Sequence, residues 1–293
     1  MRVARRWVAV TLVLVVPFVV SSVAGCGGRD RARSVNIKGS DTMVILGQKW
    51  SDEYMQAHPG AVVAVTGGGS GTGIAQLING TTDIAQSSRP MKDAEKAQMK
   101  AKRGKDVVEI PVALDGLAIY VHSSNPLKEI SLEQAKAIYT GQMSNWKELG
   151  GKDAPIIAYS RENNSGTYAY FKERVLKNED FMPEALNMPG TAAVINAVGK
   201  DKNSIGYGGI AYGKGIRTVK VKKDDKSPAV EPTMANVMSN KYPLSRALFF
   251  YTAGAPEGET KAFLDWILSP AGQKICEEVG YYPLRPKKGA KNS

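Results

Sequence analysis

The chain has 293 residues, of which 43% are hydrophobic and 23% charged, and its formal net charge is +11. This length is enough for two domains with a core each, and the composition excludes a disordered or fibrous protein. The basic residues are dispersed rather than gathered in a run with aromatic residues, so the charge favours small anions as ligands and argues against a nucleic-acid partner.

The first 25 residues resemble a lipoprotein signal peptide. Arginines near the start precede an apolar run at 7–20 and the small residues of "SSVAGC", an order typical of an export signal. The run is shorter than the roughly 20 apolar residues that a membrane-spanning helix needs. "VAGC" is similar to the lipobox of bacterial lipoproteins, which predicts cleavage before Cys26 and lipidation of that residue. A soluble secreted protein with an incidental Cys26 is the alternative. Once Cys26 is acylated, Cys276 has no disulfide partner.

Beyond a polar linker at 26–34, strands and helices alternate along the chain. The first series has strands at 35–39, 61–66, 81–85 and 107–114, and helices at 40–60, after the glycine-rich turn, and at 91–104. The second series has strands at 117–122, 154–160, 204–212 and 242–252, and helices at 131–141, 166–176, 191–200 and 259–280, the last split at Pro270. Ser131 and Gln134 form a capping box at the start of their helix. The alternation predicts an α/β protein with a parallel sheet.

Four polar turns follow the predicted strands. They are "GSDT" at 39–42, "GGGSGTG" at 67–73, "SSRP" at 87–90 and "RENNSGT" at 161–167. Free N–H groups and a partial positive charge make helix N-termini ready anion sites. Hydroxyls add donors there, and Arg89 and Arg161 can each bind an oxyanion through two N–H groups. Each turn alone is explained equally well by helix capping, but four together favour an anion site.

The glycine-rich turn does not fit the known nucleotide-binding or nucleophile motifs. Ile74 and Ala75 stand where a P-loop needs Lys and Ser or Thr, and Thr72 breaks both the dinucleotide fingerprint and the nucleophile elbow. The two histidines, His58 and His122, lie at predicted element ends and are interpreted as structural. Because no residues have metal-ligand spacing either, we expect no catalytic residue, metal or cofactor.

Several separated motifs resemble the PstS family, the phosphate-binding components of bacterial ABC importers. They include "GSDTM", "LDGLAIYVH", "SRENNSGTY" and "YPLSRALFFYT", in the family's order over about 36–284. The resemblance implies a type II periplasmic-binding-protein fold, in which crossover strands join two α/β domains and the ligand lies in the cleft between them. The crossings would lie near 112–117 and 242–247, giving a discontinuous domain I at 35–115 and 242–293 and a domain II at 116–241.

The resemblance also implies a set of phosphate-binding residues. From domain I these are Ser40, Thr42, Ser70, Ser88 and Arg89, and from domain II Arg161, Ser165, Gly166 and Thr167. Longer family members have Asp where this chain has Ser88, so another carboxylate is needed to accept the phosphate proton. Asp115, beside the crossover, is the first candidate and Asp41 the second.

The implied function is that of a monomeric, lipid-anchored receptor on the extracytoplasmic side of the cell envelope. It would bind inorganic phosphate and deliver it to the transmembrane subunits and ATPase of an ABC permease. A receptor for sulfate, molybdate or tungstate is the nearest alternative. A secreted phosphohydrolase, or an adhesion lipoprotein that keeps only the fold, belongs to another functional class.

Overall fold

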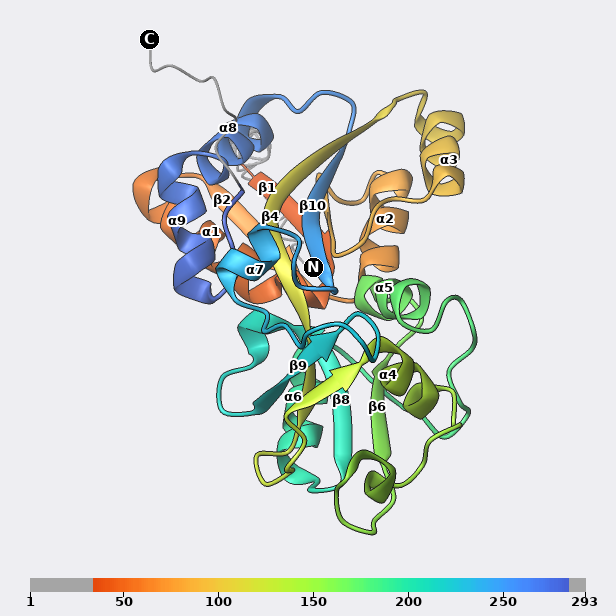
Figure 1. Cartoon of the computed structure of the whole chain (residues 1–293). Helices are drawn as coiled ribbons and strands as arrows, with labels where there is room; N and C mark the ends of the chain where they lie inside the picture. Colours follow the sequence, from red (N-terminus) through yellow and green to blue (C-terminus); the bar gives the residue numbers. More distant parts are fainter. Residues whose placement is uncertain (1–33, 285–293) are drawn as a thin grey trace, which may run out of the picture.

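The computed structural model describes residues 34–284, which form two lobes (Figure 1). The predicted signal peptide and the predicted lipidation site Cys26 lie outside the described residues. Within the part of the chain that is described, no helix combines the length and the apolar character needed to cross a bilayer.

The first lobe is built from both ends of the described chain. Its N-terminal part contains β1 (Ser34–Gly39), α1 (Val44–Ala57), β2 (Val62–Thr66), α2 (Ser70–Asn79), β3 (Ile84–Ser87) and α3 (Asp93–Arg103). Its C-terminal part contains β10 (Ser245–Ala253), α8 (Gly258–Ile267) and α9 (Pro270–Val279). Val35 and Trp50 share one fully buried core with Phe250 and Phe263. The C-terminal stretch therefore packs against the N-terminal strands.

The second lobe is formed by the middle of the chain. Its elements are β5 (Glu129–Ser131), α4 (Leu132–Tyr139), β6 (Ile157–Arg161), α5 (Gly166–Arg174), β7 (Leu186–Met188), α6 (Thr191–Lys200), β8 (Ser204–Gly209), β9 (Arg217–Lys222) and α7 (Met234–Met238). Aromatic rings fill its core, where Phe171 stacks on Tyr207 with 4.0 Å between ring centroids and Tyr139 packs edge-on against both. The lobe thus has a core separate from that of the first lobe.

One sheet runs through both lobes, in the order β2-β1-β3-β10-β4-β8-β6-β7, where β4 is Val107–Val121. The pairs β1–β2, β1–β3 and β6–β8 are parallel, as the sequence predicts. However, β10 is antiparallel to β3 and β4, and β4 is antiparallel to β8. The prediction of a parallel sheet is therefore wrong at the centre, because β4 leaves the first lobe and β10 returns to it in the opposite direction.

The long strand β4 (Val107–Val121) connects the two lobes (Figure 1). The sequence predicts two strands here, because Asp115 and Gly116 look like a turn. Both residues instead continue the strand, paired with Arg246 and Ser245 of β10. Elsewhere the periodic helices lie where they are predicted, and α6 has the predicted bounds. The predicted capping box of α4 also forms.

Candidate anion-binding site

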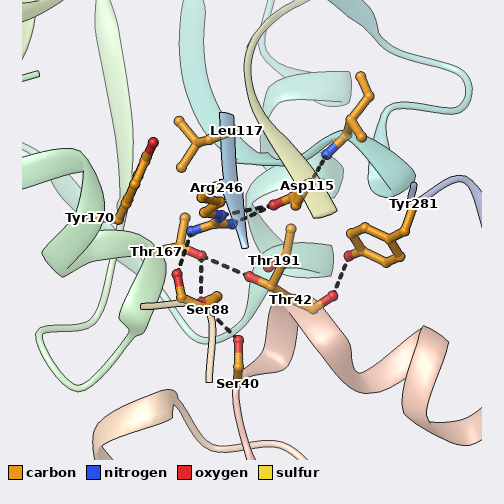
Figure 2. A network of polar contacts seen from close by, with 12 residues as sticks. Ser40, Thr42, Ser88, Asp115, Leu117, Thr167, Tyr170, Thr191, Arg246 and Tyr281 are labelled. Atoms are coloured by element: carbon orange, nitrogen blue, oxygen red, sulfur yellow. Dashed lines mark hydrogen bonds and ion pairs between the residues drawn. The ribbon is translucent and has the colours of Figure 1, made fainter. Parts of the chain in front are cut away.

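Five buried hydroxyl groups, here called the hydroxyl cluster, lie where the lobes meet. They belong to Ser40, Thr42, Ser70, Ser88 and Thr167, none of which is more than 2% exposed. Ser88 Oγ lies 2.9 Å from Ser40 Oγ and 3.4 Å from Thr167 Oγ1. Thr42 Oγ1 lies 2.7 Å from Thr167 Oγ1, and Ser70 Oγ 3.5 Å from Ser88 Oγ. Figure 2 shows the part of this network formed by Ser40, Thr42, Ser88 and Thr167, in which Thr167 of the second lobe contacts hydroxyls of the first.

Strand ends and helix starts bring these hydroxyls together. Ser40 and Ser88 directly follow β1 and β3, which are parallel neighbours, so both lie at the same edge of the sheet. Ser70 is the first residue of α2, and Thr167 is the second residue of α5. Ser165 caps α5, its Oγ accepting the N–H groups of Thr167 and Tyr168 at 3.2 and 3.3 Å. The partial positive charge of the N-termini of α2 and α5 therefore acts on the cluster.

Gly166 is placed where the lobes touch. A Cβ at this position would collide with Ser70 Oγ and lie 2.8 Å from Ser88 Oγ, closer than a methyl group can approach. Only glycine lets the start of α5 come this near to the hydroxyls of the first lobe, so this predicted residue lies beside the cluster.

Arg161 and Asp41 form an ion pair across the lobes at the rim of the site. Arg161 Nη2 lies 2.7 Å from Asp41 Oδ2, and Nη1 donates to Thr191 Oγ1 at 2.9 Å. Asp41 Oδ1 accepts the N–H of Gly68 at 2.8 Å. Burial lowers the pKa of the Arg161 guanidinium, and the Asp41 carboxylate opposes this shift. The Nε atom of Arg161 is buried and has no hydrogen-bond partner within residues 34–284.

A second arginine–aspartate pair lies at the base of the site, and its arginine is missed by the sequence prediction. Arg246 Nε and Nη2 lie 2.9 and 2.8 Å from Asp115 Oδ2 (Figure 2). Arg246 Nη1 donates to the carbonyl of Ser88 at 3.2 Å, and its guanidinium lies over the ring of Tyr170. Asp115 is completely buried, and its Oδ1 accepts the N–H of Ile210. An arginine inside the apolar segment "RALFFYT" is the sequence signal, because a buried charge needs a partner.

The side chain of Arg89 is engaged outside the hydroxyl cluster. Its Nη1 and Nη2 donate to Glu95 Oε2 and Oε1 at 2.8 and 2.6 Å, and Nη1 also donates to the carbonyl of Pro90. Burial would raise the pKa of Glu95, but the hydrogen bonds from Arg89 and from the N–H of Lys92 lower it below its ordinary value. The predicted site residue Arg89 thus forms an ion pair with α3 instead of reaching the hydroxyls.

The chemistry available at the site is that of hydrogen bonding to an oxyanion. Hydroxyls can donate as well as accept, and the two arginines are each balanced by an aspartate. Among the described residues, no His, Cys, Asp and Glu side chains are grouped to hold a metal ion. His58 contacts the carbonyl of Tyr54, and His122 contacts Ser124, so both histidines have local partners at element ends.

Comparison with known proteins first defines the class. A protein-family model described as "PBP superfamily domain" matches residues 27–271 of the sequence. The chain is therefore a member of this superfamily, and its two lobes with crossing strands form a type II periplasmic-binding-protein fold. A protein of Clostridium perfringens solved with bound phosphate has a TM-score of 0.78 and 33% identity, covering 86% of this chain and all of that one. An ABC-type phosphate transport receptor of Vibrio cholerae gives a TM-score of 0.68 and 30% identity, covering 85% of this chain and all of that one.

Curated relatives then define the family. The phosphate-binding protein PstS of Pseudomonas aeruginosa is 35% identical over 266 residues, which cover 85% of this chain and 82% of that protein. PstS of Staphylococcus aureus is 33% identical over 267 residues, which cover 88% and 80% respectively. The chain belongs to the PstS family, as its motifs predict.

Proposed function

We propose that the chain binds inorganic phosphate between its lobes on the extracytoplasmic side and delivers it to an ABC permease. The observation that carries this proposal is the hydroxyl cluster, which gathers buried donors from both lobes beside the N-termini of α2 and α5. The names of its relatives support phosphate as the ligand and an ABC importer as the partner. As a member of this family the chain is a carrier rather than an enzyme.

The phosphate contacts come from both lobes and from two arginines. The proposed ligands are Ser40, Thr42, Ser70, Ser88, Arg161, Ser165, Gly166, Thr167 and, in place of the Arg89 side chain, Arg246. Each arginine has a neighbouring aspartate, so the site holds a dianion mainly through oriented donors and helix N-termini rather than through net charge. Arg246 donates to the carbonyl of Ser88, and the buried Nε of Arg161 has no hydrogen-bond partner among the described residues. Arg246 therefore lies beside the cluster, and Arg161 has an N–H that can donate to the ligand.

Asp115 is the proposed acceptor for the proton that phosphate carries and sulfate lacks. An ionised carboxylate accepts a hydrogen bond from a phosphate O–H but repels the lone pairs of sulfate. Asp115 is buried at the base of the site, and Ile210 N–H occupies one of the two lone pairs of its Oδ1. Asp41, by contrast, is held at the rim by Arg161 and Gly68, with 22% of its side chain exposed. This contrast favours Asp115 over Asp41.

The remaining features of the proposal rest on the sequence. We propose that Cys26 carries the lipid anchor, that the chain acts as a monomer, and that the domains are divided at 35–115 with 242–293 against 116–241. The exchange between lobes at β4 and β10 supports this division.

Calorimetric titration with phosphate, sulfate and molybdate tests the function. Ser88→Ala removes a hydroxyl from the centre of the cluster, and a hydrogen bond to a charged group contributes about 1.5–3 kcal/mol, or about 10- to 150-fold in affinity. Ser51→Ala is the matched control, because Ser51 is equally buried but bonds the carbonyl of Gly47 within α1. We expect phosphate binding that Ser88→Ala weakens and Ser51→Ala leaves unchanged. Binding of sulfate or molybdate alone would replace phosphate as the ligand, and hydrolysis of a chromogenic phosphate ester would contradict the carrier function.

A further inference from the structure

Asn164 connects the turn between β6 and α5 to the glycine-rich turn of the opposite lobe. Its Nδ2 donates to the carbonyl of Gly68 at 3.1 Å and to Thr72 Oγ1 at 3.2 Å. Its own carbonyl accepts the N–H of Gly71 at 2.9 Å. One residue thus forms three hydrogen bonds between the lobes, immediately before the cap of α5 at Ser165.

The glycine-rich turn is shaped to receive Asn164. A Cβ at Gly69 would lie 2.7 Å from the Asn164 carbonyl oxygen, and one at Gly71 would lie 3.2 Å from it. The contact at Gly69 is closer than a Cβ can approach, so a side chain there would push Asn164 away, and the contact at Gly71 is tight. The lack of side chains at these two glycines therefore lets the second lobe approach the turn, in addition to leaving room for the anion site.

We propose that Asn164 is a positioning residue that latches the lobes together and thereby sets how fast phosphate leaves. This inference rests on the proposed function. A contact that exists only when the lobes touch shifts their equilibrium toward the closed arrangement by its own free energy. Because a ligand enclosed between the lobes leaves only after they separate, the latch slows dissociation, and it affects association only through the fraction of empty molecules whose lobes are open.

The latch is separable from the ligand contacts. The side chain of Asn164 bonds Gly68 and Thr72, neither of which belongs to the hydroxyl cluster. The ion pair Arg161–Asp41 also joins the lobes, but it contains a proposed ligand, so its removal would mix two effects. A change at Asn164 should alter the affinity for every enclosed anion by the same factor, because the latch contacts the protein and not the anion.

Asn164→Ala, with Asn163→Ala as the matched control, tests the latch. Asn163 is the exposed neighbour in the same turn. Two side-chain hydrogen bonds are lost in Asn164→Ala, so stopped-flow release of phosphate should accelerate about fivefold or more, with the ratio of phosphate to arsenate affinity unchanged. Thr72→Ala should accelerate release too, and the double variant should fall short of the product of the two effects. A changed ratio of phosphate to arsenate affinity would show that Asn164 contacts the ligand, and would overturn its role as a positioning residue.

A measurement without phosphate separates this proposal from the function on which it rests. Spin labels at Lys96→Cys and Lys202→Cys, both exposed and on opposite lobes, report the distance between lobes by pulsed dipolar EPR. In the protein prepared for labelling, Cys26 is also replaced by Ser, whereas Cys276 is retained because it is buried. Asn164→Ala should shift the distribution to longer distances than the parent and Asn163→Ala. Unchanged distances together with an unchanged release rate would overturn the latch. A parent that fails to bind phosphate would overturn the proposed function, and the distance comparison would still decide whether Asn164 holds the lobes together.

Discussion

Replacing Arg246 by Met should reduce both the stability of the protein and its affinity for phosphate, for two different reasons. Arg246 and Asp115 face each other as a cross-strand pair of β10 and β4, with side-chain exposures of 3% and 0%. Without Arg246, the Asp115 carboxylate is left buried with only the N–H of Ile210. Breaking a buried ion pair in this way typically costs about 3–5 kcal/mol. At roughly 2–4 °C per kcal/mol for a chain of this size, Tm should fall by about 6–20 °C.

The loss of phosphate binding should be larger than the loss of one contact. Arg246→Met removes a donor beside Ser88 and leaves an unbalanced negative charge at the base of the site. A lost charged hydrogen bond alone corresponds to about 10- to 150-fold, and the repulsion between the uncovered carboxylate and the anion adds to it. We therefore expect at least about a 100-fold weaker Kd.

The double variant Arg246→Met with Asp115→Asn separates the effect of the unbalanced Asp115 charge from the effect of the missing Arg246 donor. It removes the uncompensated charge while the Asn side-chain carbonyl can still accept the N–H of Ile210, so most of the stability should return. Phosphate affinity should stay well below that of Asp115→Asn alone, because the donor of Arg246 is still missing. Denaturant unfolding and calorimetric titration of all four proteins measure both quantities. A single variant that loses less than about 1 kcal/mol, or a double variant that binds like Asp115→Asn, would refute the reasoning.

Three further predictions concern the Arg89–Glu95 ion pair, the discrimination of phosphate from sulfate, and the lipid anchor expected from the sequence. The hydrogen-bonded ion pair with Arg89 lowers the pKa of Glu95, so its contribution to stability is complete above the unfolded-state pKa and is lost as pH falls through the folded-state value. Thermal unfolding should show that Arg89→Met destabilises the protein near neutral pH, and that the difference from the parent shrinks in acid. Competition binding should show that Asp115→Asn narrows the preference for phosphate over sulfate, whereas Asp41→Asn leaves the ratio in place. The intact mass of membrane-extracted protein should correspond to a chain that begins at an acylated Cys26, and an unmodified cysteine would contradict the anchor.

Local sequence patterns predict most elements of the fold because those elements follow local rules. Helix α6 and the pair α8 and α9, split at Pro270, have clear apolar periodicity or an explicit breaker. The strands β5 and β7 are three residues long, too short for alternation to be recognised. The continuity of β4 through Asp115 and Gly116 depends on pairing with β10, more than 120 residues away, and no local pattern contains that information.

The candidate site shows the same division between local and distant information. Turns that follow neighbouring parallel strands identify Ser40 and Ser88, because the sheet brings such turns to one edge. The side-chain direction of Arg89 is decided by Glu95, six residues later on α3, which competes with the anion site for the same guanidinium. Arg246 lies in an apolar strand, and its role becomes visible only when β4 brings Asp115 beside it. Residue type thus predicts which groups can bind an anion, and long-range pairing decides which of them lie together at the candidate site.

The two arginine–aspartate pairs differ in what holds them together, and this difference assigns them different roles. Arg246 and Asp115 are register partners on the strands that join the lobes, so their pair persists however the lobes are arranged. Arg161 is the last residue of β6 in the second lobe, and Asp41 lies just after β1 in the first, so we expect their pair to break when the lobes separate. The charge at the base of the site is therefore constant, whereas the rim pair exists only when the lobes meet. We therefore expect such a site to gain affinity through closure, because the rim pair, the Asn164 bonds and the contact of Thr167 with Thr42 all join the two lobes and would form in the same step.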